Sequence, residues 1–363
     1  ADQDASIFSD SAGAIKFVRG QDYSPVAGDT EGWVRMEIGD SGQTSFEVIG
    51  GEGGNATTYL QADGGDDNAD KWKMESTTSG TFDILTYSTG SWVKHLSLDT
   101  NSRISLSNND NNTGNTVFGK SAFNAGSDNA SDYNTAIGES AMGTGSVSGA
   151  LNNVVIGYQA GKVMTNPDDN VIIGSGAGVA LTEAEQCVII GKGAGAAITT
   201  NTAVGTSLVG YAAGAAITSG LGNVAVGGYA LDAITDSDFN TAVGYQALTS
   251  MTGTAGTTEN TAVGNGAALN LTLGKGNTVV GRYALYTDDV GDYSTAIGVY
   301  SLYFQNSDSN NEVTGNTAVG YKSGQQNVTG TNNTYLGYRA GAGASGQSNS
   351  DNTAVGKDAL LSI

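Results

Sequence analysis

The C-terminal two thirds of the chain repeats one short pattern of apolar, small and polar residues. The pattern appears as NTAIG at 134–138, as NVIIG at 170–174 and as NTAVG at 240–244. Fourteen copies end on a glycine, here called the anchor glycine, from which positions in each copy are counted. The anchor glycines are Gly119, Gly138, Gly157, Gly174, Gly191, Gly210, Gly227, Gly244, Gly264, Gly281, Gly298, Gly320, Gly337 and Gly356. Their spacing of 17 to 22 residues predicts a solenoid of about 14 coils.

Each position of the repeat has its own residue type. Position −1 is bulky and apolar in all fourteen copies, position −3 is Thr, Val or Ser in all fourteen, and position +3 is Ala in twelve copies and Ser in two. Because the alternation has period two and favours β-branched residues, it predicts a short parallel strand before each glycine. The small residue at +3 indicates a close approach of backbone or of a neighbouring chain, and we expect a second short strand to begin there. The other residues of each coil predict turns.

Position −4 is Asn in eleven copies, with Cys187, Thr206 and Ser294 as the exceptions. Stacked coils place equivalent side chains about 4.8 Å apart, so the amides can hydrogen-bond along the stack and close the adjacent turn. We predict a structural ladder that includes Asn134, Asn170, Asn223, Asn240, Asn260, Asn277, Asn316 and Asn352. We interpret Cys187 as a small substitute in this column and not as a reactive thiol.

A coil of this length buries only a few aliphatic side chains, so the rod is expected to be thin. Fourteen coils spaced about 4.8 Å apart predict a length of about 65 Å. We expect neighbouring chains to complete its core, with the Ala and Gly columns in contact about a rotation axis. The prediction is a homotrimer, although composition alone also allows a dimer or a single chain.

Residues 1–112 follow a different pattern, and we therefore expect two regions, 1–112 and 113–363. Partly alternating segments separated by Gly, Asp and Ser predict seven or eight antiparallel strands. They form one or two small β modules, with a seam near the glycine-rich stretch 50–56. The segments are 14–20, 32–39, 44–50, 57–62, 71–76, 81–87, 91–98 and 103–107.

The repeat NTAVG with Ala at +3, as in NTAVGYQAL at 240–248, resembles two groups of fibrous proteins. These are the head repeats of trimeric autotransporter adhesins and the repeats of bacteriophage tail fibres. The resemblance covers about 113–363 and implies a trimeric, left-handed parallel β-roll that binds extracellular surfaces. The period here, near 18 residues, is longer than that of the adhesin heads. Residues 59–74 and 80–99 are similar to modules of phage tail and virion-fibre proteins.

Composition excludes several classes of protein. The chain has 15 Lys+Arg and 36 Asp+Glu, a net charge of −21, which disfavours a nucleic-acid partner. No apolar run reaches the roughly 18 residues of a membrane span, so membrane insertion is not expected. With 55 Gly but two Pro and no Gly-X-Y period, the chain is not collagen. A single Cys and a single His exclude a disulfide framework and argue against structural zinc.

The acidic stretch ADGGDDNAD contains a candidate calcium site. Asp63, Asp66, Asp67 and Asp70 place carboxylates at calcium-like spacing, although the terminal Glu of an EF-hand loop is missing. The alternative is a solvated acidic hairpin turn, and no other cofactor is expected.

Tyrosines at position +1 form a candidate glycan- or receptor-binding stripe, since an exposed ring can stack on a sugar face. The alternative is that the rings shield the ladder beneath them. These tyrosines are Tyr158, Tyr211, Tyr245, Tyr321 and Tyr338. His95 could serve as a general base, but a lone His without a defined partner favours a structural role.

Together these features predict a non-enzymatic fibre that acts outside the cell or on a virion. We expect a bacteriophage tail fibre or virion appendage that attaches to the host surface. Its partners would be other virion or fibre proteins and a cell-surface glycan or protein. One alternative is a bacterial trimeric surface adhesin. Another is a tailspike that depolymerises polysaccharide, which requires two carboxylates several ångströms apart.

Overall fold

The computed structural model consists of two compact units, residues 1–108 and 109–363, and each is described by itself. The boundary lies four residues before the one expected from the sequence. The structure describes the strand backbones at 5–9, 15–19, 33–38, 44–49 and 104–105 and the ranges 53–61, 71–88, 90–98, 114–123, 131–143, 147–183, 185–199, 204–252, 256–310, 312–344, 346 and 348–361.

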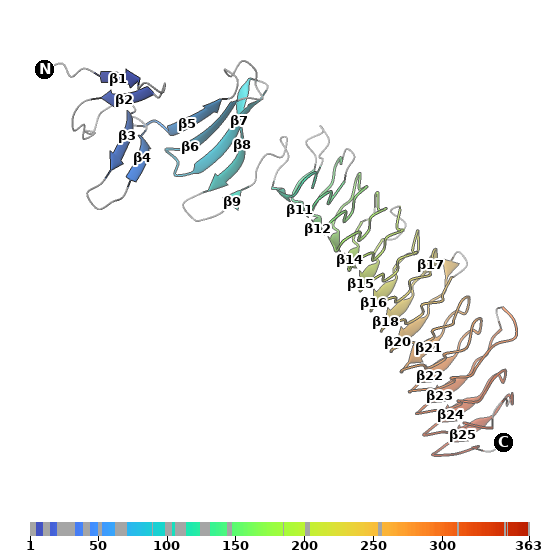
Figure 1. The fold of residues 1–363 in the computed structure, drawn as a ribbon. Helices are drawn as coiled ribbons and strands as arrows, with labels where there is room; N and C mark the ends of the chain where they lie inside the picture. The colour runs from blue at the N-terminus through green and yellow to red at the C-terminus, as the bar shows by residue number, and fades with distance from the viewer. Residues whose placement is uncertain are drawn as a thin grey trace. The chain divides into compact units, whose positions relative to one another are not determined.

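The described strands of the first unit are all antiparallel (Figure 1). Two hairpins pair β1 (Ala5–Ser9) with β2 (Ile15–Arg19) and β3 (Trp33–Ile38) with β4 (Thr44–Ile49). A five-stranded sheet follows in chain order, from β5 (Ala56–Gln61) through β6 (Lys71–Ser76), β7 (Phe82–Ser88) and β8 (Ser91–Leu98) to β9 (Ile104–Ser105). All eight predicted segments contain a strand. β1 is an additional strand that the pattern does not predict, because only a few of its residues alternate.

The second unit is a parallel β-solenoid whose strands form one fourteen-stranded sheet (Figure 1). Each strand occupies positions −3 to −1, and the register pairs equivalent positions, as in Ala242 with Ala262. Thirteen steps of about 4.8 Å make the sheet about 62 Å long. A separate short pair joins β17 (Ser237–Asp238) to β19 (Gly256–Thr257). The fourteen strands are β10 (Thr116–Phe118), β11 (Thr135–Ile137), β12 (Val154–Ile156), β13 (Val171–Ile173), β14 (Val188–Ile190), β15 (Ser207–Val209), β16 (Val224–Val226), β18 (Thr241–Val243), β20 (Thr261–Val263), β21 (Thr278–Val280), β22 (Thr295–Ile297), β23 (Thr317–Val319), β24 (Thr334–Leu336) and β25 (Thr353–Val355).

The anchor glycines meet two requirements that only glycine satisfies. Their φ values lie between 120° and 147°, a region that side chains rarely enter. They also stack directly on one another. A Cβ on Gly244 would lie 2.5 Å from the carbonyl oxygen of Gly264 in the next coil.

The chain turns after each anchor glycine, so the expected second strand at this place is wrong. Position +2 has a positive φ in all fourteen coils, as in Tyr229 at 57° and Gln246 at 57°. This conformation is incompatible with an extended strand. Hydrogen bonds between coils nevertheless continue through the turn. The N–H at +2 donates backward, Gly176 N to Tyr158 O at 2.9 Å, and the N–H at +4 donates forward, Gly161 N to Ala177 O at 2.9 Å.

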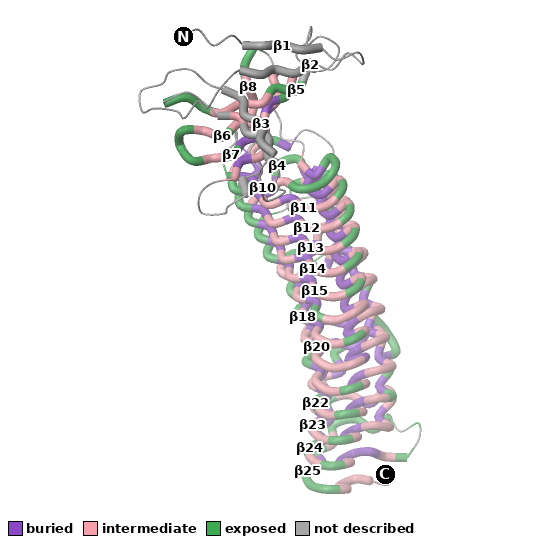
Figure 2. Tube along the Cα trace, turned by 60° about the vertical axis from the view of Figure 1, so that its left-hand side comes forward, coloured by how far each residue is buried: buried purple, intermediate pink, exposed green. Residues whose placement is uncertain are grey.

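The core of the solenoid lies inside the coils of the single chain (Figure 2). Position −2 points inward, and the Ala column at +3 is buried in the same interior, with Ala247 fully inaccessible. The Ala column is therefore not available to a neighbouring chain. The expected contact through the Ala column is wrong, because these residues fill the interior of their own coil, while contact through the half-buried or exposed anchor glycines stays a prediction.

Candidate functional site

The Asn column forms a buried hydrogen-bonded ladder. Asn153 shows the pattern, since its backbone N–H and its Nδ2 both donate to Oδ1 of Asn134, at 3.0 and 2.9 Å. Its own Oδ1 accepts the same pair of bonds from Asn170, both at 3.0 Å. Its Nδ2 also donates to the turn carbonyl of Pro167 at 2.7 Å. Each amide thus joins three coils, as the spacing predicts.

Three runs make up the ladder, because other residues interrupt it. The runs join Asn115 to Asn170, Asn223 to Asn277 and Asn316 to Asn352. At the first interruption the backbone N–H of Cys187 still donates to Oδ1 of Asn170 at 3.0 Å. Burial raises the pKa of the Cys187 thiol to about 11. A protonated, buried thiol is a poor nucleophile.

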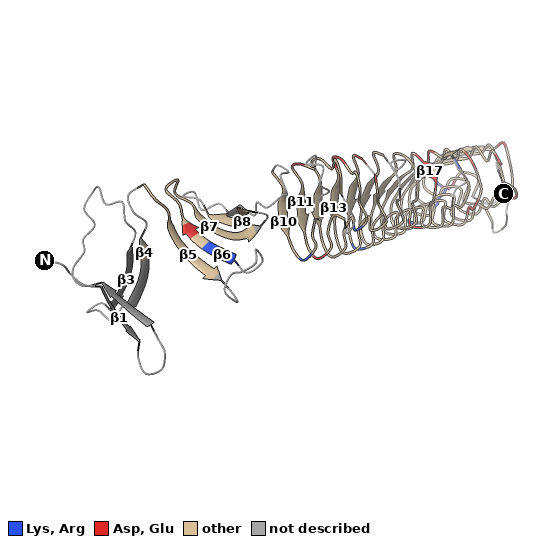
Figure 3. Ribbon diagram, turned by 90° about the horizontal axis from the view of Figure 1, so that it is seen from above, with Lys and Arg blue, Asp and Glu red and all other residues tan. Residues whose placement is uncertain are grey.

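The outer face of the solenoid sheet is a continuous uncharged surface, here called the outer sheet face. It consists of positions −3 and −1 of the fourteen strands of the solenoid sheet, which are nine Thr, four Val and one Ser at −3 and fourteen Ile, Val, Leu or Phe at −1. Its side chains are half-buried or exposed in the single chain, for example Val226 at 39% and Ile297 at 37%. The charged residues of this unit fall outside these strands (Figure 3). The sequence does not distinguish this column from the core column at −2, because both are apolar.

The five tyrosines predicted for surface contact are exposed, from 40% for Tyr321 to 53% for Tyr158. Tyr211 and Tyr245 flank Tyr229, with edge-on ring contacts of 5.2 and 6.0 Å. Tyr321 and Tyr338 stack in adjacent coils at 5.4 Å. The structure therefore divides the stripe into separate groups of rings.

A larger group of rings lies in the coils that begin at Gly281 and Gly298, and we call it the aromatic–basic cluster. Tyr286 and Tyr303 lie parallel, with centroids 5.0 Å apart and planes 2° apart. Both stand at position +5, so a search of the columns beside the glycine misses them. The cluster comprises Arg282, Tyr283, Tyr286, Tyr300, Tyr303, Phe304 and Lys322.

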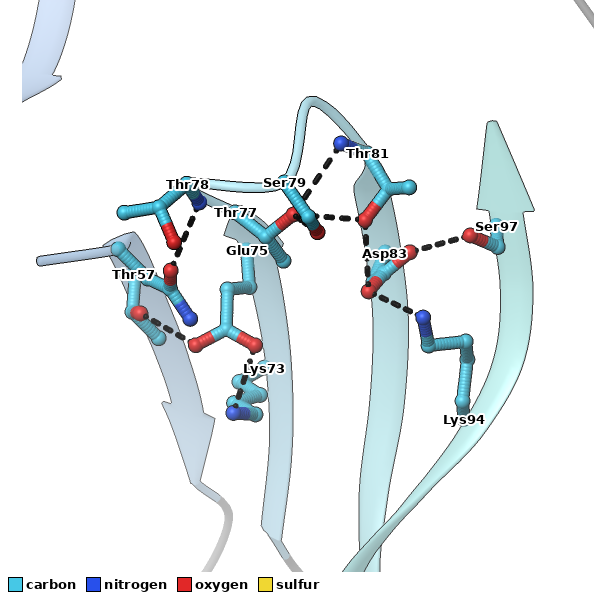
Figure 4. Close-up of polar contacts among 11 residues, drawn as sticks. Thr57, Lys73, Glu75, Thr77, Thr78, Ser79, Thr81, Asp83, Lys94 and Ser97 are labelled. Atoms are coloured by element: carbon cyan, nitrogen blue, oxygen red, sulfur yellow. Dashed lines mark hydrogen bonds and ion pairs between the residues drawn. The ribbon is translucent and has the colours of Figure 1, made fainter. Parts of the chain in front are cut away.

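The N-terminal sheet carries a network of paired charges on β6, β7 and β8 (Figure 4). The Asp83 carboxylate accepts from Ser97 at 2.5 Å and pairs with Lys94 at 2.6 Å. Burial acts to raise the pKa of Asp83, but the bonds from Lys94 and Ser97 outweigh it and hold the pKa below its ordinary value. Glu75 is matched in the same way by Lys73, at 2.9 Å, and by Thr57. Ionised, fully partnered carboxylates suit cross-strand stabilisation better than acid catalysis.

His95 lies in the same sheet, where its Nε2 is 2.7 Å from Oγ1 of Thr86. Its ring lies 5.6 Å from that of Trp72. A histidine packed between a tryptophan and a threonine fits the structural interpretation.

The calcium candidate, Asp63, Asp66, Asp67 and Asp70, lies outside the described residues. Within the described part of the chain, no three His, Cys, Asp or Glu side chains are grouped to hold a metal ion. Over the same residues, no helix has the length and apolar character needed to cross a membrane.

One buried carboxylate interrupts the core. Position +7 is an aliphatic or Met side chain from Met164 to Leu271 and becomes polar at Asp288, Gln305 and Asn327. Oδ1 of Asp288 accepts from Ser307 Oγ at 2.9 Å and from the N–H of Gly291 at 3.2 Å. Its Oδ2 is buried without a hydrogen-bond partner. Burial raises the pKa of Asp288, and the charge of Asp289 adds to the effect.

Comparison of the chain with protein-family models, with curated proteins and with solved structures finds no match.

Proposed function

We propose that the protein is a structural fibre whose solenoid associates with two further copies of itself and presents its surface to a cell. In this proposal it is a bacteriophage tail fibre or related virion appendage that mediates attachment without catalysis. The observation that carries the proposal is the outer sheet face, an uncharged strip about 62 Å long with an unbroken apolar column at position −1, on a chain of net charge −21.

Parallel sheets normally have both faces covered. In the single chain the inner face is covered by the turns of each coil, while the outer sheet face remains partly open along all fourteen strands. A continuous column of fourteen partly exposed apolar side chains, at position −1, is typical of an interaction site.

A second copy of the chain is the occupant that fits this surface. The strip repeats every coil and contains no charged residue, so an identical strip matches it in length, spacing and polarity. An unrelated acidic or basic partner would find no complementary charge on it. The expectation of three chains comes from the resemblance of the repeat to trimeric fibres. In a closed arrangement about a rotation axis, the outer sheet face of every copy is covered in the same way.

The turns of each coil remain on the outside of such an assembly and carry the exposed tyrosines. They would supply the contact with a cell surface, repeated once per chain. Weak contacts repeated in this way gain strength from multivalency.

A binding assay on intact cells tests the function. Fluorescently labelled protein, applied to a panel of bacterial strains and to their phage-resistant derivatives, should bind at least one strain saturably and leave its polysaccharide intact. Gold-labelled antibody against the protein should decorate virion appendages in electron micrographs. Release of new reducing ends from capsule, or labelling confined to bacterial surfaces, would contradict the assignment.

A further inference from the structure

The aromatic–basic cluster differs in chemistry from the rest of the solenoid surface. In the coils that begin at Gly281, Gly298, Gly320 and Gly337, the first six residues after the glycine contain seven aromatic residues, three cations and no acid. The acidic residues of the first two of these coils, including Asp288, Asp308 and Glu312, come at position +7 or later. A chain of net charge −21 thus presents one face that is locally basic.

The rings of the cluster form a fixed platform. The parallel pair of Tyr286 and Tyr303 is held on both sides, since Tyr283 meets Tyr286 edge-on at 5.2 Å and Tyr300 meets Tyr303 edge-on at 5.4 Å. Phe304 contacts Tyr303 at 4.6 Å and stays 39% exposed. Aromatic side chains held by one another lose little further freedom when a ligand stacks on them.

Two cations lie at the edge of this platform. The Arg282 guanidinium lies 4.7 Å from the centre of the Tyr283 ring, and the Lys322 ammonium lies 6.0 Å from the centre of the Tyr300 ring. Among the described residues neither cation forms an ion pair with a carboxylate. Their charges therefore remain available to an anion, at positions two coils apart, a separation of about 10 Å along the stack.

We infer that the aromatic–basic cluster binds an acidic saccharide. Aromatic rings stack on the apolar face of a pyranose, and guanidinium and ammonium groups bind carboxylate or sulfate. A neutral glycan would leave the two unpaired cations unused. A nucleic acid would carry a phosphate on every nucleotide toward a strongly acidic chain, which disfavours it. The inference rests on the proposed attachment function and names the class of receptor.

The test measures binding of a hyaluronan decasaccharide, in which acidic and neutral sugars alternate, by isothermal titration calorimetry on the full chain. Hyaluronan should bind, with affinity that falls as salt rises. The double variant Arg282→Gln/Lys322→Gln and the single variant Phe304→Ala should each lose at least tenfold in affinity with an unchanged melting temperature. Lys192→Gln is the matched control, because Lys192 is an exposed cation at position +1 outside the cluster, and it should bind like the unmutated protein.

Three results would overturn the inference. These are equal binding of maltodecaose, tighter binding of a thymidine oligonucleotide, and an unchanged affinity in the double variant. Cell binding separates this inference from the proposed function. Attachment that survives in the double variant refutes the receptor class alone, while hyaluronan binding without any attachment to cells refutes the function alone.

Discussion

Positive φ values recur at four places in each coil, at positions −5, 0, +2 and, in thirteen coils, +4. Only the special conformation at position 0 could be predicted from the sequence. There the contact with the next coil excludes every side chain, so all fourteen copies have glycine. The other positions accept Leu248, Tyr229 or Asp169 in a left-handed conformation, so residue type gives no signal there. This is why the turn after the anchor glycine could be mistaken for a strand.

A substitution at position 0 should therefore cost more than one at +2. Gly244→Ala places a methyl group against the Gly264 carbonyl at a φ of 138°, and strain together with overpacking should destabilise the fold by about 3 kcal/mol or more. Gly193→Ala is the matched control, because the space around it is open and Ala212 already occupies that position in the next coil. Its φ of 67° should add only the cost of a left-handed alanine, about 1–2 kcal/mol, without overpacking. Chemical denaturation measures both, and equal costs would refute the stacking role of the anchor glycine.

Asp288 should make stability depend on pH. Its folded pKa is raised, so the folded state holds the proton more tightly than the unfolded state, whose pKa is about 3.9. The stability that this provides is complete below the unfolded pKa and is lost as pH rises through the folded pKa. Asp288→Asn keeps the acceptor for Ser307 and Gly291 but carries no charge. Its melting temperature should exceed that of the unmutated protein at pH 7.5 and match it near pH 3.

Asp308→Asn provides the control for this pH profile, since Asp308 is exposed in the next coil. It should leave the melting temperature unchanged at both pH values. A gain for Asp288→Asn that is the same at pH 3 and pH 7.5 would show that burial of the charge is not the cause.

At the scale of the element, the repeat predicts the strand and the Asn ladder because both depend on one periodic column. The orientation of the strand could not be predicted from three residues. Val243 at −1 and Ala242 at −2 are both apolar, yet Ala242 is fully buried and Val243 faces outward. The side of the strand that the turns of the same coil cover becomes the core, and three residues do not indicate which side that is.

Within each run of the ladder, loss of an internal Asn should destabilise the fold more than loss of a terminal one. Asn240→Ala removes the acceptor of both the N–H and the Nδ2 of Asn260, at 3.0 and 3.3 Å. The buried N–H of Asn260 then has no partner, while its Nδ2 keeps the Gly274 carbonyl at 2.8 Å, and the loss should cost about 2–4 kcal/mol. Asn352→Ala, at the last strand of the column, keeps its backbone bond to Asn333 and should cost less than about 1 kcal/mol. Equal losses in urea denaturation would contradict a ladder that transmits order between coils.

At the scale of the whole molecule, the spacing of the glycines predicts the number of strands, but not which surface of the single chain stays open for the proposed association. The small residues at +3 predict a contact through the Ala column, but that column is buried in the interior of its own coil. The aliphatic residues at −1 are the surface that remains. The candidate binding residues were predicted in part, because the +1 tyrosines recur at one position while the +5 rings occur in only two coils.

Charges on the outer sheet face should separate the chains without unfolding them. Val226→Asp/Ile297→Asp places two carboxylates at exposed positions of that face, where the cost to a single chain should stay near 1 kcal/mol. Their burial between chains would be far more expensive. Val163→Asp, at an apolar position of similar exposure away from the sheet, should leave the assembly intact.

The mass of the unmutated protein in solution tests the central claim most directly. Size-exclusion chromatography with multi-angle light scattering should give about three times the chain mass of 36.6 kDa. The same measurement should return a single chain mass for Val226→Asp/Ile297→Asp and the trimer mass for Val163→Asp. A mass of 36.6 kDa for the unmutated protein across the micromolar range would contradict the account, because the outer sheet face would then remain open to solvent.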